Sequence, residues 1–486
     1  MKHMNGDLIK ISDIFSFFMK SFVALCIIVS VSLVSYSAFW NHSQWHLCPD
    51  CQEQNFIATV TKFTQGPVSN ETDISHVLFG IGGSAKTWNT RRHYSEVWWK
   101  SNVTRGFVWL DDAPDSTIKW PETSPPYRIS EDTARFKYTS WYGSRSAIRI
   151  ARIVKESYDL RLDGVRWFVL GDDDTVFFVE NLLTVLRKYD HNQMYYIGGN
   201  SESVEQDLIH SYDMAYGGAG FAISYPLASE LVRVLDGCID RYASFYGSDQ
   251  KIQGCISEIG VPLTKELGFH QVDLRGDAYG LLAAHPVAPL VSLHHLDYLQ
   301  PIFPGLTRVG SVKKLVQPYN ADPARILQPS FCYDLQKNWS VSIAWGYTVQ
   351  LYPKLVTSKV METAFRTFVS WRSWSHEPFT FNTRIMSSDP CQVPVIYFMD
   401  RVEASNETGQ TVTRYVQAPK QGKLCERTEY TGAMNIQNVN VSADRLEPAI
   451  WNKAPRRQCC EIIEGGEEDL QVRVRDCQRW ESVTPP

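Results

Sequence analysis

The chain has 486 residues, of which 48 are basic and 53 acidic, giving a formal net charge of −5. A protein that wraps nucleic acid through its phosphates carries a surplus of Lys and Arg, so this balance excludes that class of partner. Ordinary contents of Gly, Pro and charged residues exclude collagen, coiled coil and long disorder. Aromatic residues are unusually frequent at 13 %, which indicates either a well-filled core or a surface that stacks on sugar rings.

Residues 21–40 carry no charge. Twenty such residues in a helix span the ~30 Å hydrocarbon layer of a bilayer, so they predict a transmembrane signal anchor. Three lysines precede the stretch and no Lys or Arg follows until Lys62, which predicts a cytosolic tail at 1–20 and a lumenal remainder. A cleaved signal peptide is the alternative, because the tripeptide YSA resembles a cleavage site.

The cysteines fit an oxidising lumen. Of 11 cysteines, Cys26 lies in the uncharged stretch, and the other ten form an even set suited to disulfides. Cys238 and Cys255 are the favoured local pair, whereas the pairing of the later cysteines stays open. Cys48 and Cys51 have redox or zinc spacing, but no second pair accompanies them, which favours a disulfide in a stem. N-glycosylation sequons occur only on the predicted lumenal side.

The chain after the anchor divides by pattern. Residues 41–73 are polar without a clear period and predict a stem. Residues 74–305 alternate apolar runs with amphipathic stretches, which predicts an α/β domain with a largely parallel sheet. The predicted strands are HVLFGIGG, GFVWLDD, VRWFVLGDDDTVFF and YYIGG, and the predicted helices are RRHYSEVWWK, SRSAIRIARIVKESYDL, VENLLTVLRKYD and LASELVRVLDGCID. Ligands of such sheets bind beyond the carboxyl ends of the strands, where acids follow the second and third runs.

Residues 306–486 have a different character. The segment VSIAWGYTVQL, residues 341–351, alternates large apolar residues with smaller or polar ones, which predicts one two-sided β-strand. The segments VPVIYFM and TVTRYVQ show a similar alternation. We therefore expect a β-rich, disulfide-containing C-terminal module.

Three consecutive acids, Asp172, Asp173 and Asp174, directly follow the apolar run WFVL. Carboxylates this close repel one another at pH 7 unless a cation or a donor-rich pocket holds them. A hard divalent metal completed by substrate phosphate oxygens is one explanation. The alternative is a solvated acidic turn before a helix that starts near Val179. The position at a strand end favours the metal.

Five motifs in order, HVLFGIGG, RRHYSEVWW, RWFVLGDDDTVF, YGGAGFAIS and GSDQKIQGCI, resemble fringe-like β1,3-type inverting glycosyltransferases over about residues 76–300. The later blocks LLAAHPVAPLVSLHHLDYLQPIFPG and FCYDLQKNWSVSIAWGYTVQ resemble a plant family of uncharacterised fringe-related membrane proteins. The resemblance implies a GT-A (Rossmann-like) fold, Mn²⁺ and transfer of a hexose or N-acetylhexosamine from a UDP-sugar, with inversion. It further implies a glycan acceptor on a glycoprotein, polysaccharide or lipid, and a type II protein of the Golgi membrane.

The same resemblance suggests roles for the acids. Asp174 corresponds to the metal ligand, Asp172 or Asp173 to the group that binds the nucleotide sugar, and Asp111 to the acid on the uridine side. Asp249 corresponds to the general base that takes a proton from the acceptor hydroxyl. Its alternative role is to cap the helix that begins there.

Fringe-like enzymes add a C-terminal His to the metal. His270 in GFHQVD is preferred here, and His294 and His295 are the alternatives, although a His beside a strand is more often simply hydrogen-bonded. Other candidates for donor binding are Gly217, Gly218, Gly220, Arg91 and Arg92. The alternative for the three glycines is a tight turn, and the alternative for the two arginines is a helix face exposed to solvent.

Two other functions compete. Asp172, Asp174 and Val176 satisfy the D-x-D-x-V pattern of phosphatases with an aspartyl nucleophile, here Asp172. Such enzymes also need a later Lys and an acidic pair after a strand, whereas Asp236 and Asp240 end a predicted helix. The third possibility is a non-catalytic carbohydrate-binding scaffold.

The tryptophans divide between the two parts of the chain. Those expected in the core of the first domain are Trp98, Trp99, Trp109 and Trp167. Those in the C-terminal module, where a sugar-stacking face stays open, are Trp339, Trp345, Trp371 and Trp374.

Overall fold

A computed structural model describes residues 19–32, 71–371, 382–405, 407–419, 425–463 and 465–485. The chain divides into two units, Met1–Ser69 and Asn70–Pro486. In the first unit the described residues 19–32 form a helix. Across all the described ranges, no helix is long and apolar enough to cross a membrane, so the predicted anchor over 21–40 is not supported. Residues 33–40, most of the predicted stem and the pair Cys48 and Cys51 lie outside the described residues.

The second unit contains a seven-stranded sheet in the order β3-β2-β1-β4-β7-β6-β8. Its strands are β1 Val77–Gly82, β2 Arg105–Leu110, β3 Tyr127–Ile129, β4 Trp167–Asp172, β6 Tyr196–Gly198, β7 Phe221–Ser224 and β8 Leu263–Lys265. The parallel pairing of β2, β1 and β4 confirms the predicted α/β sheet. β7 runs antiparallel to both β4 and β6, so the sheet is mixed, because a strand's direction is set by its connections and not by its residues.

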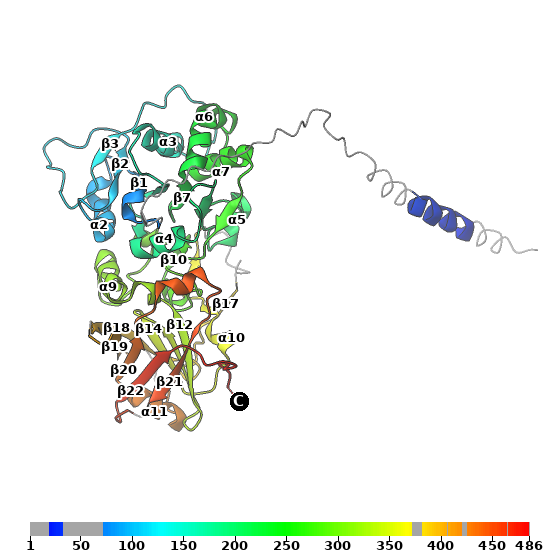
Figure 1. The fold of residues 1–486 in the computed structure, drawn as a ribbon. Helices are drawn as coiled ribbons and strands as arrows, with labels where there is room; N and C mark the ends of the chain where they lie inside the picture. The colour runs from blue at the N-terminus through cyan, green and yellow to red at the C-terminus, as the bar shows by residue number, and fades with distance from the viewer. Residues whose placement is uncertain are drawn as a thin grey trace, which may run out of the picture. The chain divides into compact units, whose positions relative to one another are not determined.

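Helices cover both faces of this sheet. The predicted helices are confirmed as α2 Trp88–Trp98, α3 Ser146–Asp159, α4 Val179–Leu186 and α6 Tyr225–Arg241. The helix expected to begin at Asp249 is α7 Ser248–Ile259, and α5 Val204–Ile209 is additional. Helices α3, α6 and α7 pack together on one side, at the top of Figure 1, over a buried apolar cluster. Helix α4 and helix α9, Arg308–Ala321, lie on the side that faces the C-terminal strands.

A small second sheet, β5-β11-β9, lies beyond the end of β4. Its strands are β5 Val176–Phe177, β9 Phe269–His270 and β11 Ser292–Leu293. β11 is antiparallel to β5, with Leu293 opposite Val176, and parallel to β9, with Leu293 opposite His270. This register brings the residues after β11 next to the acidic turn that precedes β5.

The C-terminal part is a closed barrel of strands β12-β13-β14-β18-β19-β20-β22-β21, which confirms the predicted β-rich module. The strands are β12 Pro329–Asp334, β13 Trp339–Ala344, β14 Thr348–Tyr352, β18 Val395–Ala404, β19 Gln410–Gln417, β20 Asn438–Asp444, β21 Gln458–Ile463 and β22 Asp469–Arg475. The prediction of one strand over 341–351 is wrong. Gly346 has a φ of 77° and turns the chain, so β13 and β14 form a hairpin.

Shorter elements connect these parts. They are α8 Tyr279–Leu282, α10 Ser358–Met361, α11 Thr428–Asn435, β10 Leu274–Gly276, β15 Ala364–Phe365, β16 Phe368–Ser370 and β17 Thr383–Arg384. β16 pairs with β10, which joins a segment from within the barrel sequence to the first domain. One buried apolar cluster also extends from β1 and β4 through α4 and α9 into the barrel. The predicted boundary between 305 and 306 stays a prediction.

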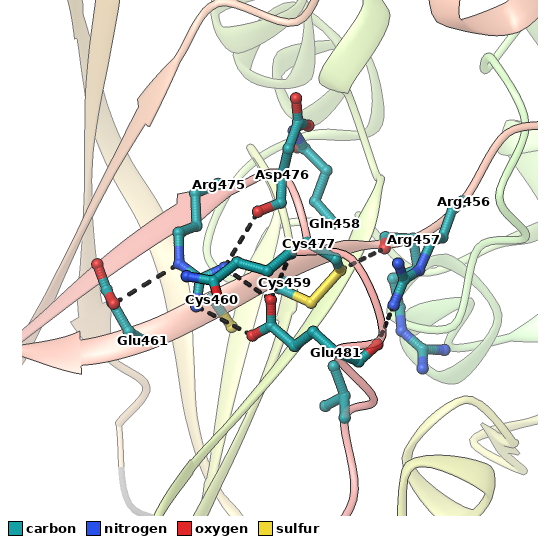
Figure 2. Close-up of a disulfide and its surroundings, with 12 residues drawn as sticks. Arg456, Arg457, Gln458, Cys459, Cys460, Glu461, Arg475, Asp476, Cys477 and Glu481 are labelled. Carbon is teal, nitrogen blue, oxygen red and sulfur yellow. Dashed lines mark hydrogen bonds and ion pairs between the residues drawn. A yellow bond between two sulfur atoms is a disulfide. The ribbon is translucent and has the colours of Figure 1, made fainter.

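Four disulfides join described cysteines. Cys238–Cys255 confirms the favoured pair, and the others are Cys332–Cys460, Cys391–Cys425 and Cys459–Cys477. Figure 2 shows the Cys459–Cys477 disulfide beside Glu481. Nη1 of Arg475 lies 2.9 Å from Oε2 of Glu481. Because both sulfur atoms of Cys459 and Cys477 are bonded to each other, they offer no thiolate to a metal.

The tryptophans predicted to be core, Trp98, Trp99, Trp109 and Trp167, are all buried. Trp339 and Trp345 are buried as well, so they present no sugar-stacking face. Trp374 lies outside the described residues.

We expect the double variant Cys238→Ala, Cys255→Ala to lose about 2–4 kcal/mol of unfolding free energy, because the disulfide closes a loop between α6 and α7. Urea titration of the purified protein measures the loss, with the wild-type protein, its disulfides intact, as the reference. An unchanged free energy would show that packing alone holds these two helices together.

Candidate active site

The three acids lie on a turn that its neighbours hold rigidly. β4 ends at Asp172, whose backbone N–H donates to Oγ1 of Thr175 at 2.8 Å. The Thr175 hydroxyl in turn donates to the carbonyl of Gly218 at 2.7 Å. The indole N–H of Trp98 donates to the Thr175 carbonyl at 3.0 Å. The turn is therefore fixed from both sides, which favours a binding role over that of a freely solvated loop.

His294 is the histidine that meets these acids. Its Nε2 lies 3.1 Å from Oδ1 of Asp174 and 3.8 Å from Oδ2 of Asp172. One ligand atom from each of these three residues lies within 4.8 Å of the others. The reason is the β11–β5 register, since His294 directly follows Leu293 and continues along the strand toward the acidic turn.

The preference for His270 has to be corrected. His270 is the register partner of Leu293, so its side chain and that of the next residue, His294, lie on opposite faces of the small sheet. His270 instead places Nδ1 2.9 Å from Glu202 and Nε2 3.0 Å from His285. Sequence spacing from Asp249 cannot reveal this difference of one residue in register.

The third candidate, His295, turns away from the acids. Its backbone is left-handed, with a φ of 54°, and its Nδ1 lies 3.1 Å from Oδ1 of Asp273. Its ring stacks on Trp371 with 4.3 Å between the centroids and 5° between the planes. His295 is therefore a neighbour of the acid and histidine group and not a member of it.

Burial and charge set the titration of the group. Burial raises the pKa of Asp172 to about 7 and that of Asp173 to about 6. Burial also acts against the charge of Asp174, but the facing His294 and Arg91 outweigh it and hold this pKa below its usual value. Burial likewise disfavours protonated His294, yet the charges of Asp174 and Asp172 raise its pKa to about 9. Nη1 of Arg91 lies 3.0 Å from Oδ1 of Asp173.

The donor set fits a divalent cation. Carboxylate oxygens and an imidazole nitrogen are ligands that Mn²⁺ accepts, and the remaining positions stay open for substrate oxygens. Oδ1 of Asp174 is buried and receives no well-aligned hydrogen bond from the described residues. Asp172, Asp174 and His294 would hold the ion.

Asp249, Asp172 and His294 line one cavity. The volume of this cavity is about 320 Å³. The N-cap of helix α7 is Gly247, so Asp249 lies in the first turn of the helix and not at the N-cap position. The Asp249 carboxylate accepts the N–H of Gly217 at 3.2 Å and that of Gln250 at 2.9 Å. Burial raises its pKa, although these two hydrogen bonds act against the shift. The group is oriented and faces the cavity.

The three glycines have different roles. A Cβ on Gly218 would lie 2.0 Å from Cε1 of His294, so glycine is needed for that ring to fit. A Cβ on Gly217 would lie 3.6 Å from Asp249, which is an ordinary contact. Gly220 has a φ of 79° and packs against Phe177, so it shapes the turn into β7 and does not line the cavity.

Asp111 and Arg92 lie away from the acid and histidine group. Asp111 follows β2 and accepts the Ser84 hydroxyl at 2.9 Å and the Ala85 N–H at 2.8 Å. Asp111 lies at the carboxyl end of β2, where ligands of such sheets bind. Its role on the uridine side stays a prediction. Arg92 pairs with Glu96 on its own helix and not with the acids, which corrects its grouping with Arg91.

Several residues of the site were not found by sequence reasoning. Arg149 on α3 is buried and donates to the carbonyls of Trp109 and Gly83, each at 2.8 Å, which ties the ends of β2 and β1 together. Asp273 lines the cavity as well, and so does Trp371, which the sequence analysis named as a possible sugar-stacking residue of the C-terminal module without placing it at this cavity. Trp371 arrives through the β16–β10 pairing, a long-range contact that leaves no local sequence signal.

Comparison with known families supports this picture. The model of the Fringe-like family matches residues 89–276 and supports a fringe-like glycosyltransferase class. The model of the family described as "Protein of unknown function, DUF604" matches residues 206–460, more than half of the chain. The chain therefore belongs to the DUF604 family, which is fringe-related. Kinship with the plant proteins in particular stays a prediction.

We expect Gly218→Ala to weaken Mn²⁺ binding by about 10- to 100-fold, because its Cβ displaces the imidazole of His294. Gly217→Ala is the matched control, since its Cβ makes only an ordinary contact. Titration calorimetry on the purified variants measures the affinity, and thermal unfolding checks the fold. Equal affinities in the two variants would remove His294 from the proposed metal site.

Proposed function

We propose that this protein is a metal-assisted inverting glycosyltransferase that moves a hexose or N-acetylhexosamine from a UDP-sugar to a glycan hydroxyl. The observation that carries the proposal is that Asp172 and His294 line one cavity with Asp249, and that both belong to a close group of ligand atoms with the buried Asp174. The Fringe-like match supports the same class of enzyme.

Asp249 acts as the general base in this proposal. The acceptor oxygen attacks the anomeric carbon, the bond from that carbon to the diphosphate oxygen breaks, and the hydroxyl proton passes to the Asp249 carboxylate. The N–H groups of Gly217 and Gln250 hold the carboxylate in place. Burial, which raises its pKa, makes it a better proton acceptor than an exposed aspartate.

The acids and histidine serve the leaving group. A divalent cation held there would supply positive charge to offset the charge that grows on the diphosphate. Asp172, Asp174 and His294 would hold that ion, and Arg91 keeps Asp173 paired beside it. Asp111 is proposed to bind the uridine side, and Gly217 and Gly218 to allow close approach of the donor sugar.

The competing functions have less support. Among the described residues that line the cavity there is no lysine to assist an aspartyl phosphate on Asp172. Asp236 is engaged by Arg152 at 2.9 Å, so it is not free for the second acidic pair of a phosphatase. A non-catalytic carbohydrate-binding scaffold would have no need of an oriented Asp249.

The compartment is part of the proposal. Four disulfides support an oxidising secretory compartment. Within it, the Golgi is the location that we propose, because nucleotide-sugar transfer to glycans is the chemistry inferred for this site.

We expect the purified protein to release UDP from one member of a UDP-sugar panel in the presence of Mn²⁺. UDP release should stop when EDTA removes the ion. Asp174→Asn should abolish this release, because it removes a charged ligand atom. Absence of UDP release with every donor, together with a phosphatase activity that Asp172→Asn abolishes, would contradict the proposal.

Asp249→Asn should lower kcat by about 10²- to 10⁴-fold while the KM for the donor changes little, since the amide cannot take the proton. Steady-state kinetics with the active donor test this. Asp240→Asn, an exposed acid outside the cavity, is the control and should keep full activity.

A further inference from the structure

A group of aromatic side chains lies at the rim of the catalytic cavity. This rim cluster consists of Trp141, Tyr142, Tyr246 and His210. Trp141 is 91 % exposed and Tyr142 is 46 % exposed, which is unusual for rings of this size. Tyr246 and His210 line the cavity itself. The cluster is therefore continuous with the space that holds Asp249.

The rings of the rim cluster are stacked on one another. Tyr142 and Tyr246 lie 5.1 Å apart with 9° between their planes, and His210 stacks on Tyr246 at 5.3 Å and 22°. Trp141 meets Tyr142 edge to face at 5.1 Å. These residues come from three separate loops, before α3, before α7 and after α5. The stack of Tyr142, Tyr246 and His210 leads from the cavity to the outer indole, so a ligand that extends from the cavity along these rings reaches Trp141.

A buried polar group in the cavity lacks a partner. Gln206 on α5 is only 4 % exposed, and its Nε2 makes no hydrogen bond with the described residues. Gln206 lines the cavity together with His210 and Tyr246. Because a buried amide without a partner is costly, this position indicates a ligand oxygen that accepts from it.

Away from the cation proposed to hold the donor diphosphate, the charge of the cavity disfavours an acidic ligand. Its described lining includes Asp172, Asp249 and Asp273 and contains no Lys or Arg. Arg145, close by in sequence, directs its guanidinium to backbone carbonyls, including that of Thr133 at 2.9 Å. A ligand at this end is therefore neutral, since a negative one would meet like charges.

We propose that the rim cluster and Gln206 form the acceptor subsite for a neutral oligosaccharide of at least two sugar residues. The reacting sugar presents its hydroxyl to Asp249 and accepts a hydrogen bond from Gln206. A following sugar stacks on the exposed indole of Trp141. This assignment rests on the proposed glycosyltransferase function and names the class of its acceptor.

The test compares Trp141→Ala with Trp480→Ala. Trp480 is 87 % exposed and lies in the C-terminal segment, so it controls for the loss of a surface indole. The probes are fluorescently labelled mono- and tetrasaccharides of β-linked glucose, galactose and N-acetylglucosamine. Binding is measured by fluorescence anisotropy on the full chain without any donor. UDP release from the donor panel in the absence of acceptor is measured separately on the same samples.

We expect a tetrasaccharide to bind the wild-type protein and the Trp480→Ala variant equally, and Trp141→Ala about tenfold more weakly, as the loss of one stacking contact predicts. Trp141→Tyr should restore part of the affinity, monosaccharide binding should not change, and donor-only UDP release should be the same in all variants. Equal tetrasaccharide binding by the two alanine variants, or no binding of any tetrasaccharide by the wild-type protein, would overturn the subsite. Lack of UDP release with intact oligosaccharide binding would overturn the transferase function instead.

Discussion

The pairing of two short strands, β11 with β5, is the constraint on which the site depends. It places the imidazole of His294 against Asp174 at 3.1 Å, inside the protein. Three adjacent carboxylates at the end of β4, of which Asp173 and Asp174 are buried, would otherwise repel one another. His294 on one side and Arg91 on the other supply the opposing charges, and Gly218 leaves room for the imidazole ring. Loss of this register would leave buried acids uncompensated, so fold and chemistry depend on the same contact.

The C-terminal barrel takes part in the same arrangement. Its buried cluster continues into that of the sheet through α4 and α9. The pairing of β16 with β10 carries Trp371 into the cavity, where it stacks on His295 beside His294. The barrel is therefore not simply attached to a complete first domain, because a residue from within the barrel sequence lines the cavity.

The limits of prediction from sequence follow from the range of the interactions. Periodic patterns predicted the helices and central strands, and acids at strand ends predicted the position of the cavity, because these are local features. Sequence spacing favours His270, whereas the structure brings His294 to the acids, because the placement depends on a register between segments far apart in the chain. The hairpin at Gly346 was missed, because strict alternation of apolar residues continued through the turn. Arg149 was not predicted, and Trp371 was named only as a possible sugar-stacking residue of the C-terminal module, because only the fold brings the two residues to the site.

The aromatic surplus of the composition has two physical explanations in one molecule. Trp88, Trp167 and Trp345 are among the largest fully buried side chains and fill the core. Trp141 is the opposite case, and exposure alone would not distinguish it from Trp480. The difference lies in what surrounds each indole. Trp141 extends a stack of rings that ends inside the cavity, next to an unpartnered buried amide and an oriented carboxylate, and this continuity is the reason to assign it a ligand.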